Sequence, residues 1–173
     1  LPFESPYDGG RALVTDVAHP VASPFGWHDT DGIPGPEFTR TRGNNVHAYA
    51  DRLANNLPDP GSDPDGGPGL LFDFPLDEAA TTEIYTDAAV VNLFYWNNVM
   101  HDIAYVYGFD EVAGNFQVNN YGRGGVGGDD VRCEAADGGG QNNANFSTPA
   151  ADGGRPRMQM YLWPGNQFGS QNV

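Results

Sequence analysis

The stretch YTDAAVVNLFYWNNVMHDIAYVYGF, residues 85–109, holds the longest apolar run of the chain and predicts one long helix. We place this helix at residues 86–107, because Thr86 or Asp87 can cap its start and Gly108 stands where a left-handed residue ends a helix. At 100° per residue one broad apolar face forms. Its members are Leu93, Trp96, Met100, Ile103, Ala104 and Tyr107. The first half is apolar nearly all round, so we expect a buried central helix.

Residues 101–105, HDIAY, match the zinc-binding helix H-E-x-x-H of metallopeptidases only in the first histidine and in having an acidic residue after it. A catalytic zinc takes three protein ligands and favours imidazole, whereas this segment offers one imidazole, a shortened carboxylate and the phenol of Tyr105. The other histidines, at positions 19, 28 and 47, have no ligand-like spacing. We interpret His101 as a packed structural residue, with a supporting role beside a metal ligand as the alternative. No catalytic residue and no zinc ligand are expected in this chain.

Charge and composition limit the partners and the covalent links that we expect for this chain. Among 173 residues, 23 acidic side chains face 8 basic ones, all arginine, for a net charge of −15. We expect no nucleic-acid partner, because phosphate binding needs a positive surface. No run of 18 apolar residues exists, so we expect no membrane span. Cys133 is the single cysteine, which rules out an intramolecular disulfide bond.

The rest of the chain predicts an α+β fold. Residues 1–69 are dense in Pro, Gly, Asp and Asn and indicate a long irregular arm, with short extended pieces such as RALVTDVA and NNVHAYADR. Residues 115–163 alternate with period two between glycine clusters and indicate a mostly antiparallel sheet. Inward positions are Phe116 and Val118, then Val131, Cys133 and Ala135, then Met158, Met160 and Leu162. Residues 164–173 are polar and suit a linker or boundary.

Long strings of this sequence resemble one family. NLFYWNNVMHDIAYVYGFDEVAGNFQ, NNYG, NNANFSTP and PRMQMYLW look like the amino-terminal part of the catalytic domain of fungalysin-type metallopeptidases, secreted enzymes related to thermolysin. ASPFGWHDTDG and RGNNVHAYADR resemble the bacterial members. The resemblance implies that residues 1–163 form a thermolysin-like amino-terminal lobe. In that family H-E-x-x-H and a further glutamate ligand follow the segment matched by MQMYLW, so the zinc ligands and general base are expected in a missing carboxy-terminal half.

The same resemblance implies a substrate-binding strand. In the thermolysin fold an edge strand with an Asn-Ala step holds an extended peptide by backbone pairing, and the matching positions here are Asn143 and Ala144. From the residues alone, adding a peptide to a strand edge is a general mode of recognition. An ordinary surface strand whose asparagines close a turn is the alternative.

A second candidate site is a calcium cage. DPGSDPDGG places Asp59, Asp63 and Asp65 in one tight loop, and calcium takes several carboxylate and carbonyl oxygens. The spacing does not complete an EF-hand, and a solvated acidic turn is the alternative interpretation. In addition, Asn145-Phe146-Ser147 is a glycosylation sequon, which would matter in a eukaryotic secretory host.

The resemblance implies a secreted zinc metalloendopeptidase acting on peptides or proteins, in which a zinc-activated water attacks the peptide carbonyl. This chain would supply part of the substrate-binding wall and would be inactive alone. The alternative function is a noncatalytic extracellular binding module with acidic, calcium-binding loops. An intact mass of the native protein distinguishes the two.

Overall fold

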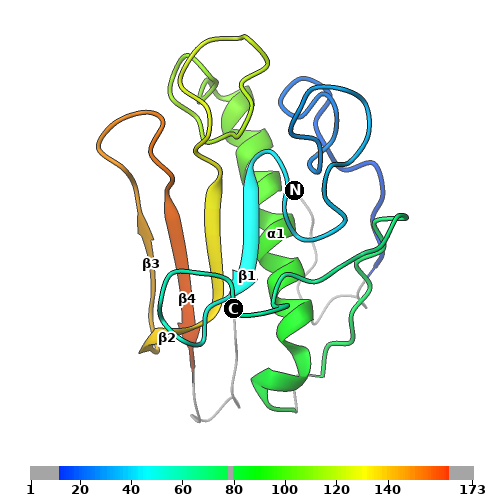
Figure 1. The fold of residues 1–173 in the computed structure, drawn as a ribbon, viewed down its shortest axis with the longest axis vertical. Coiled ribbons are helices and arrows are strands. Elements are labelled where there is room, and N and C mark those ends of the chain that lie inside the picture. Colours follow the sequence, from blue (N-terminus) through cyan, green and yellow to red (C-terminus); the bar gives the residue numbers. More distant parts are fainter. Residues whose placement is uncertain (1–11, 78–79, 164–173) are drawn as a thin grey trace.

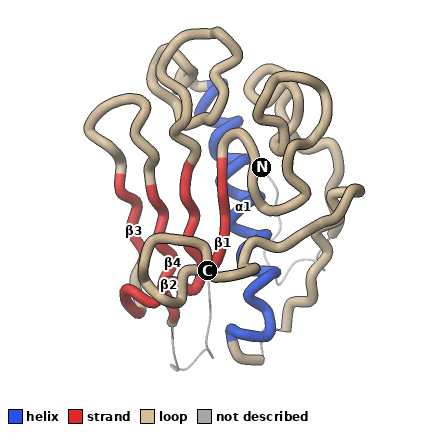
Figure 2. Tube along the Cα trace, in the orientation of Figure 1, coloured by secondary structure: helices blue, strands red, loops and turns tan. Residues whose placement is uncertain are grey.

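The computed structural model of the protein describes residues 12–77 and 80–163, and it contains one long helix beside a four-stranded sheet (Figure 1). The elements in chain order are β1 (Val46–Ala50), α1 (Thr82–Val106), β2 (Val131–Gln141), β3 (Ala144–Ser147) and β4 (Arg157–Leu162). Helix and sheet form two layers; loops of the arm and the loop that follows α1 lie near the carboxyl end of the helix, and the connection from β1 to α1 crosses its amino-terminal half (Figure 2). The α+β class is as predicted, whereas residues 164–173, predicted as a linker, lie outside the described residues.

The sheet is mixed, which corrects the prediction of a mostly antiparallel one. Its strand order is β1-β2-β4-β3; β1 pairs parallel with β2, β2 pairs parallel with β4, and only β3 pairs antiparallel with β4. Side chains alternate with period two in both kinds of sheet, so alternation carries no information on strand direction. Direction is set by the connections. The chain leaves β2, returns through the short β3, and reverses again into β4.

The helix begins earlier than predicted and ends where Gly108 places the stop. Thr81 is extended, with φ −76° and ψ 156°, and its side chain makes no capping hydrogen bond; Tyr85 leaves helical geometry at φ −113° and ψ 17°. The predicted start at residue 86 is therefore the first residue after this kink. Gly108 has φ 97°, and its N–H donates to the carbonyl of Tyr105 at 3.0 Å. The N–H of Phe109 donates to the carbonyl of Ala104. These paired bonds are the Schellman ending that glycine permits.

Alternating residues of β1 and β2 face the first half of α1 and form the core. Buried members are Trp27, Val46, Ala48, Ala50, Val90, Leu93, Phe94, Val131, Cys133 and Ala135. The period-two prediction for Val131, Cys133 and Ala135 is confirmed. The strand predicted at Phe116 and Val118 is absent, because that segment is an irregular loop in the structure.

The second half of α1 buries its polar side, opposite to the prediction. Asn98 and Asp102 are 0% and 6% exposed, whereas Trp96, Met100 and Tyr107 are 40%, 57% and 87% exposed. In the described residues the expected burial of the helix is therefore seen for one side of its first half, where Val90, Leu93 and Phe94 are buried, and not for the apolar side of its second half. Polar contacts from the arm cover the side that carries Asp102, and they leave the apolar side facing outward. Exposed large apolar side chains therefore gather on the outer side of this half of the helix.

The amino-terminal arm protects one edge of the sheet. The N–H of Ala48 donates to the carbonyl of Thr41 at 2.8 Å, the Thr41 hydroxyl donates back to the carbonyl of Ala48 at 2.8 Å, and the N–H of Ala50 reaches the carbonyl of Ser62. The outer edge of β1 is thereby paired, so it is closed to a further strand. Within residues 12–77 and 80–163, no helix has the length and hydropathy needed to cross a bilayer.

Candidate functional site

The opposite edge of the sheet is open, and β3 forms it. All four residues of β3 are exposed. The carbonyl of Asn143 accepts a hydrogen bond from the N–H of Tyr161 in β4 at 3.3 Å, so the backbone polar groups of Asn143 face β4. Backbone groups of successive residues in an extended strand point to opposite sides, and those of Ala144 therefore face away from the sheet. This is the edge at which an added strand can pair.

The side chain of Asn143 occupies the first of these outward groups. Its Oδ1 accepts the N–H of Ala144 at 2.8 Å. An incoming peptide carbonyl would compete with this amide oxygen for the same N–H. The two residues predicted as substrate-binding are thus brought together at the open edge, with the side chain of one covering the backbone of the other.

Next to this edge an apolar groove runs between α1 and β4. It has a volume of about 260 Å³ and is lined by Asn92, Leu93, Trp96, Asn97, Met100, Met158 and Met160. The amide of Asn97 donates to the sulfur of Met158 at 3.5 Å and fixes the two elements together. Methionine side chains adapt to varied apolar shapes, so the groove suits an apolar partner.

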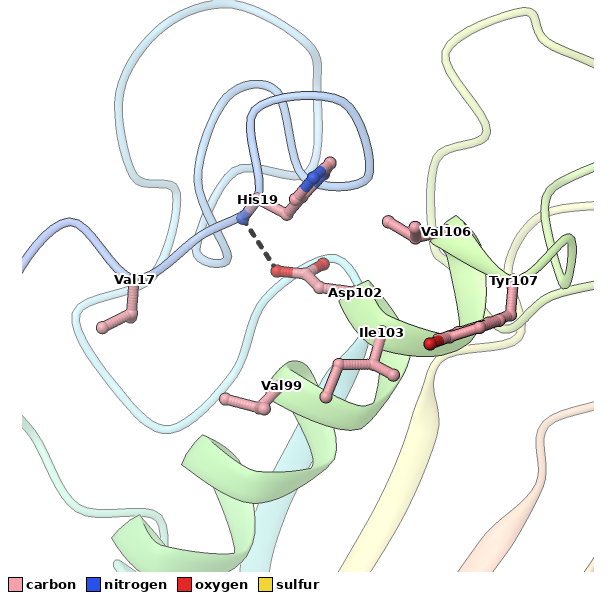
Figure 3. A pocket seen from close by; sticks show the side chains of 7 residues that line it. All are labelled: Val17, His19, Val99, Asp102, Ile103, Val106 and Tyr107. Atoms are coloured by element: carbon pink, nitrogen blue, oxygen red, sulfur yellow. Dashed lines mark hydrogen bonds between the residues drawn. The ribbon is translucent and has the colours of Figure 1, made fainter. Parts of the chain in front are cut away.

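Asp102 lies at the centre of a buried polar cluster on the other side of α1. Its carboxylate accepts hydrogen bonds from the N–H of His19 at 2.9 Å, from the Ser23 hydroxyl at 2.7 Å and from the Trp27 indole at 2.9 Å. Figure 3 shows the first of these bonds at the margin of a cavity of about 400 Å³, with the apolar side chains of Ile103 and Val106 across from the arm. One carboxylate therefore ties the arm to the helix.

The same carboxylate determines the role of His101. The Nδ1 of His101 lies 3.0 Å from Asp102 Oδ1, its Nε2 is 3.4 Å from the amide of Asn115, and its side chain is 8% exposed. The interpretation of His101 as a packed, hydrogen-bonded residue is confirmed. Burial alone would raise the pKa of Asp102, but the hydrogen bonds from His101, from the His19 backbone and from the Trp27 and Ser23 side chains outweigh it and lower that pKa. Asp102 therefore stays ionised.

The arm-binding role of Asp102 was missed in the sequence. HDIAY resembles a zinc-binding helix in outline, and in that comparison Asp102 is only a shortened carboxylate. The one usable signal was the position of Asp102 in the same helical arc as Asn98, which lies fully buried and accepts the amide of Asn45 at 3.1 Å. A polar stripe on a helix that is otherwise apolar indicates partners from elsewhere in the chain.

The three aspartates predicted to bind calcium already have other partners. Asp63 and Asp65 both pair with Arg40, at 3.0 and 3.7 Å, and Asp59 accepts the N–H of Arg52 at 3.1 Å. Arg40 supplies the positive charge that a cation would bring. Calcium at this loop stays a prediction.

Among residues 12–77 and 80–163, two groups of three acidic side chains could hold a metal ion. They are Asp29, Asp31 and Glu37, and Asp51, Glu134 and Asp137. Neither contains a histidine. The described residues therefore do not fit a catalytic zinc, which needs imidazole ligands in an open site. The sequon residue Asn145 already donates its amide to Gln159 and Tyr161.

In the part of the chain that the structure describes, the mixed sheet, the long helix and the open strand edge make an α+β fold in which one face of the helix is exposed. Comparison with known proteins then gives the family: the chain belongs to the fungalysin metallopeptidases (M36), whose family model matches residues 1–171. The recognition made from the sequence is confirmed.

Three curated relatives are fungal. The extracellular metalloproteinase MEP of Leptosphaeria maculans is 43% identical over 167 residues, the extracellular metalloproteinase of Pyrenophora tritici-repentis 46% over 167 residues, and extracellular metalloproteinase 5 of Trichophyton tonsurans 42% over 168 residues. These alignments cover 93%, 93% and 94% of this chain but 25%, 24% and 26% of the relatives. The chain thus spans about a quarter of the length of the relatives it matches.

Proposed function

We propose that this chain is the amino-terminal lobe of a secreted zinc metalloendopeptidase and that it supplies the strand on which peptide substrate is held. Membership of the fungalysin family supports the peptidase, and the relatives' names as extracellular metalloproteinases support secretion. The fold supports a thermolysin-like lobe in its α+β class. The substrate class is extended peptide or unfolded protein segment.

The observation that carries the proposal is the open edge at Ala144. One edge of the sheet is paired by the arm, whereas at β3 the backbone groups of Ala144 face outward and its neighbours in β3 are exposed. A peptide that adds to such an edge gains main-chain hydrogen bonds whatever its side chains are. Asn143, at the start of the strand, turns its amide from the N–H of Ala144 to the peptide main chain.

The metal chemistry belongs to another part of the protein. The described residues offer no histidine group that fits zinc, and His101 is already held by Asp102 and Asn115. We assign the zinc ligands and the general base to the carboxy-terminal half, downstream of this segment. The chain alone is accordingly inactive, and zinc is a cofactor of the whole enzyme.

The uncovered apolar surface is where that half docks. Trp96 and Met100 on α1 and Met160 on β4 line the groove beside the substrate strand. Burying such side chains contributes about 1.5–3 kcal/mol each, enough for a few of them to hold two lobes together. Docking there would place the catalytic half next to the peptide held by Ala144.

The alternative function is a noncatalytic extracellular module with acidic loops. Two measurements on the native protein separate the proposals: its intact mass, and its peptidase activity with and without a zinc chelator. A longer species with chelator-sensitive activity supports the peptidase. A native species that carries no segment beyond this chain, with no activity at any zinc concentration, contradicts the peptidase and favours the module.

A further inference from the structure

A short loop in the arm gathers three carboxylates. Asp29, Asp31 and Glu37 each bring one carboxylate oxygen within 4.8 Å of the others. The loop closes on itself through the N–H of Glu37, which donates to the carbonyl of His28 at 3.2 Å. Two oxygens bound to one calcium ion at about 2.4 Å can be at most about 4.8 Å apart, so the spacing is compatible with a shared ion.

Asp29 is the unusual member, because it is fully buried with an unpaired oxygen. Its exposed fraction is 0%, and Oδ2 has no hydrogen-bond partner. The other oxygen, Oδ1, accepts the N–H of Gly32 at 2.9 Å and the hydroxyl of Tyr121 at 3.4 Å. Burial, and then the charges of Glu37 and Asp31, raise the pKa of Asp29. A buried carboxylate oxygen without a donor is costly and needs a partner.

No arginine or histidine of the described segments forms an ion pair with these three carboxylates. The second acidic group is different, since Arg157 Nε lies 3.7 Å from Glu134 Oε2. The loop predicted to bind calcium is different too, because Arg40 pairs with two of its aspartates. The carboxylates at positions 29, 31 and 37 are therefore the acidic group that still lacks a positive charge.

We propose that Asp29, Asp31 and Glu37 bind one divalent cation, calcium by preference, with the unpaired Oδ2 of Asp29 as the buried ligand. All donors are oxygen, which suits a hard cation. Asp31 and Glu37 are exposed, so water can complete the six to eight ligands that calcium takes. Magnesium needs a stricter octahedron and gives up water reluctantly, so a half-exposed loop favours calcium.

The ion would fasten the arm to a distant loop. Tyr121 reaches Asp29, and the amide of Asn119 donates to the carbonyl of Thr30 at 3.2 Å, so the site lies against residues about 90 positions downstream. A chain with a single cysteine has no internal disulfide for this purpose. Calcium sites of extracellular modules typically have dissociation constants of about 0.1–1 mM, and we expect a value in this range here. This expected affinity rests on the proposed secretion, whereas the site itself does not.

The test uses the complete zinc-loaded protein with terbium as a luminescent substitute for calcium. Tyr121 contacts the site and should sensitise terbium emission, which calcium should displace in the millimolar range. Calcium at about ten times its dissociation constant should raise Tm by about 2–5 °C. Asp31→Asn and Glu37→Gln should each weaken calcium binding at least tenfold. Asp73→Asn, at an exposed aspartate in the connection between β1 and α1, is the charge-matched control and should change nothing.

A further variant separates the luminescence from the binding. Tyr121→Phe should lose most of the sensitised emission and keep the calcium-dependent rise in Tm, because the carboxylates remain. If Asp31→Asn and Glu37→Gln both leave the terbium emission and the calcium affinity unchanged, the ion binds elsewhere and the proposal is wrong. The proposal is also wrong if calcium has no effect on the unmodified protein. Peptidase activity is assayed separately, so an inactive protein that binds calcium here rejects the proposed function and leaves the site intact.

Discussion

The amide oxygen of Asn143 accepts the backbone N–H of Ala144 at 2.8 Å, so the side chain of Asn143 covers the donor that a bound peptide would use at this open edge. If Asn143 holds the peptide main chain as proposed, an Asn143→Ala enzyme loses that side-chain contact. A net hydrogen bond is worth about 0.5–1.5 kcal/mol, so kcat/KM should fall about two- to tenfold. The loss should be similar for three unrelated peptides, because the contact is with backbone.

Ala144→Pro in the same enzyme should be more damaging, since proline removes the outward N–H and distorts the edge. A melting curve controls for folding in both variants. Unchanged kcat/KM in a normally folded Asn143→Ala enzyme would mean that β3 does not hold substrate.

Asp102→Asn should release the arm from the helix. The carboxylate accepts the N–H of His19, the Ser23 hydroxyl and the Trp27 indole, and an amide cannot accept all of these bonds. We expect a loss of about 2–4 kcal/mol in the free energy of unfolding and faster proteolysis within residues 12–27. Urea unfolding and limited proteolysis measure the two effects, with Asp73→Asn as the control. Equal protection of the arm in both variants would show that Asp102 does not hold it.

His101→Ala should lower stability and leave metal content unchanged. The side chain is nearly buried between Asp102 and Asn115, and its removal leaves polar partners unpaired. We expect about 1–3 kcal/mol of destabilisation with one zinc per molecule of the complete enzyme retained. Metal analysis of the folded variant measures the stoichiometry, and a stoichiometric loss of zinc there would contradict the structural role.

His47 should make the fold sensitive to acid. Burial, and then the charge of Arg42, lower the pKa of His47 from 6.5 to about 4. The folded state thus binds fewer protons than the unfolded chain between these values, so stability is complete above pH 6.5 and falls as the pH drops towards 4. The contribution is at most about 3 kcal/mol. His47→Gln should flatten this part of the curve, measured as the difference in unfolding free energy between the two proteins; parallel curves would exclude the histidine as the cause.

Met100→Glu tests the surface proposed to dock the catalytic half. Met100 is 57% exposed in this segment, and it lines the groove between α1 and β4. If the second half covers it, a buried charge should cost the complete enzyme about 2 kcal/mol or more. Val112→Glu, at a residue that is 77% exposed and outside the groove, is the matched control. Equal melting temperatures for the two variants would show that the catalytic half does not cover the groove.

Local features of the fold were predictable, and longer-range ones were not. Gly108 ended the helix as its left-handed geometry requires, and β2 alternated as Val131 and Cys133 indicated. Strand direction failed because alternation is the same in parallel and antiparallel sheets. The prediction of the buried helix face is wrong for another reason. Trp96 and Met100 are apolar as core residues are, but the side of the helix that is buried in this segment carries Asp102 and Asn98.

The candidate sites divide in the same way. Asn143 and Ala144 were located through family resemblance, and the structure adds that they lie on an open edge and bond to each other. The acidic loop at residues 59–65 is predicted as a calcium site from its local density of aspartate. Arg40, which pairs with two of those aspartates from more than 20 residues away, could not be seen by counting charges along the chain.

The parallel pairing of β1 with β2 also affects how the protein is made. Val46 lies opposite Val131, so 85 residues separate the two sides of the first strand pair. At about 5–20 residues per second, a ribosome needs roughly 4–17 s to add that length. Throughout this interval the apolar face of β1 has no sheet to join, and α1 must be synthesised before the core can close. Nonlocal pairing of this kind slows folding and exposes the nascent chain to aggregation.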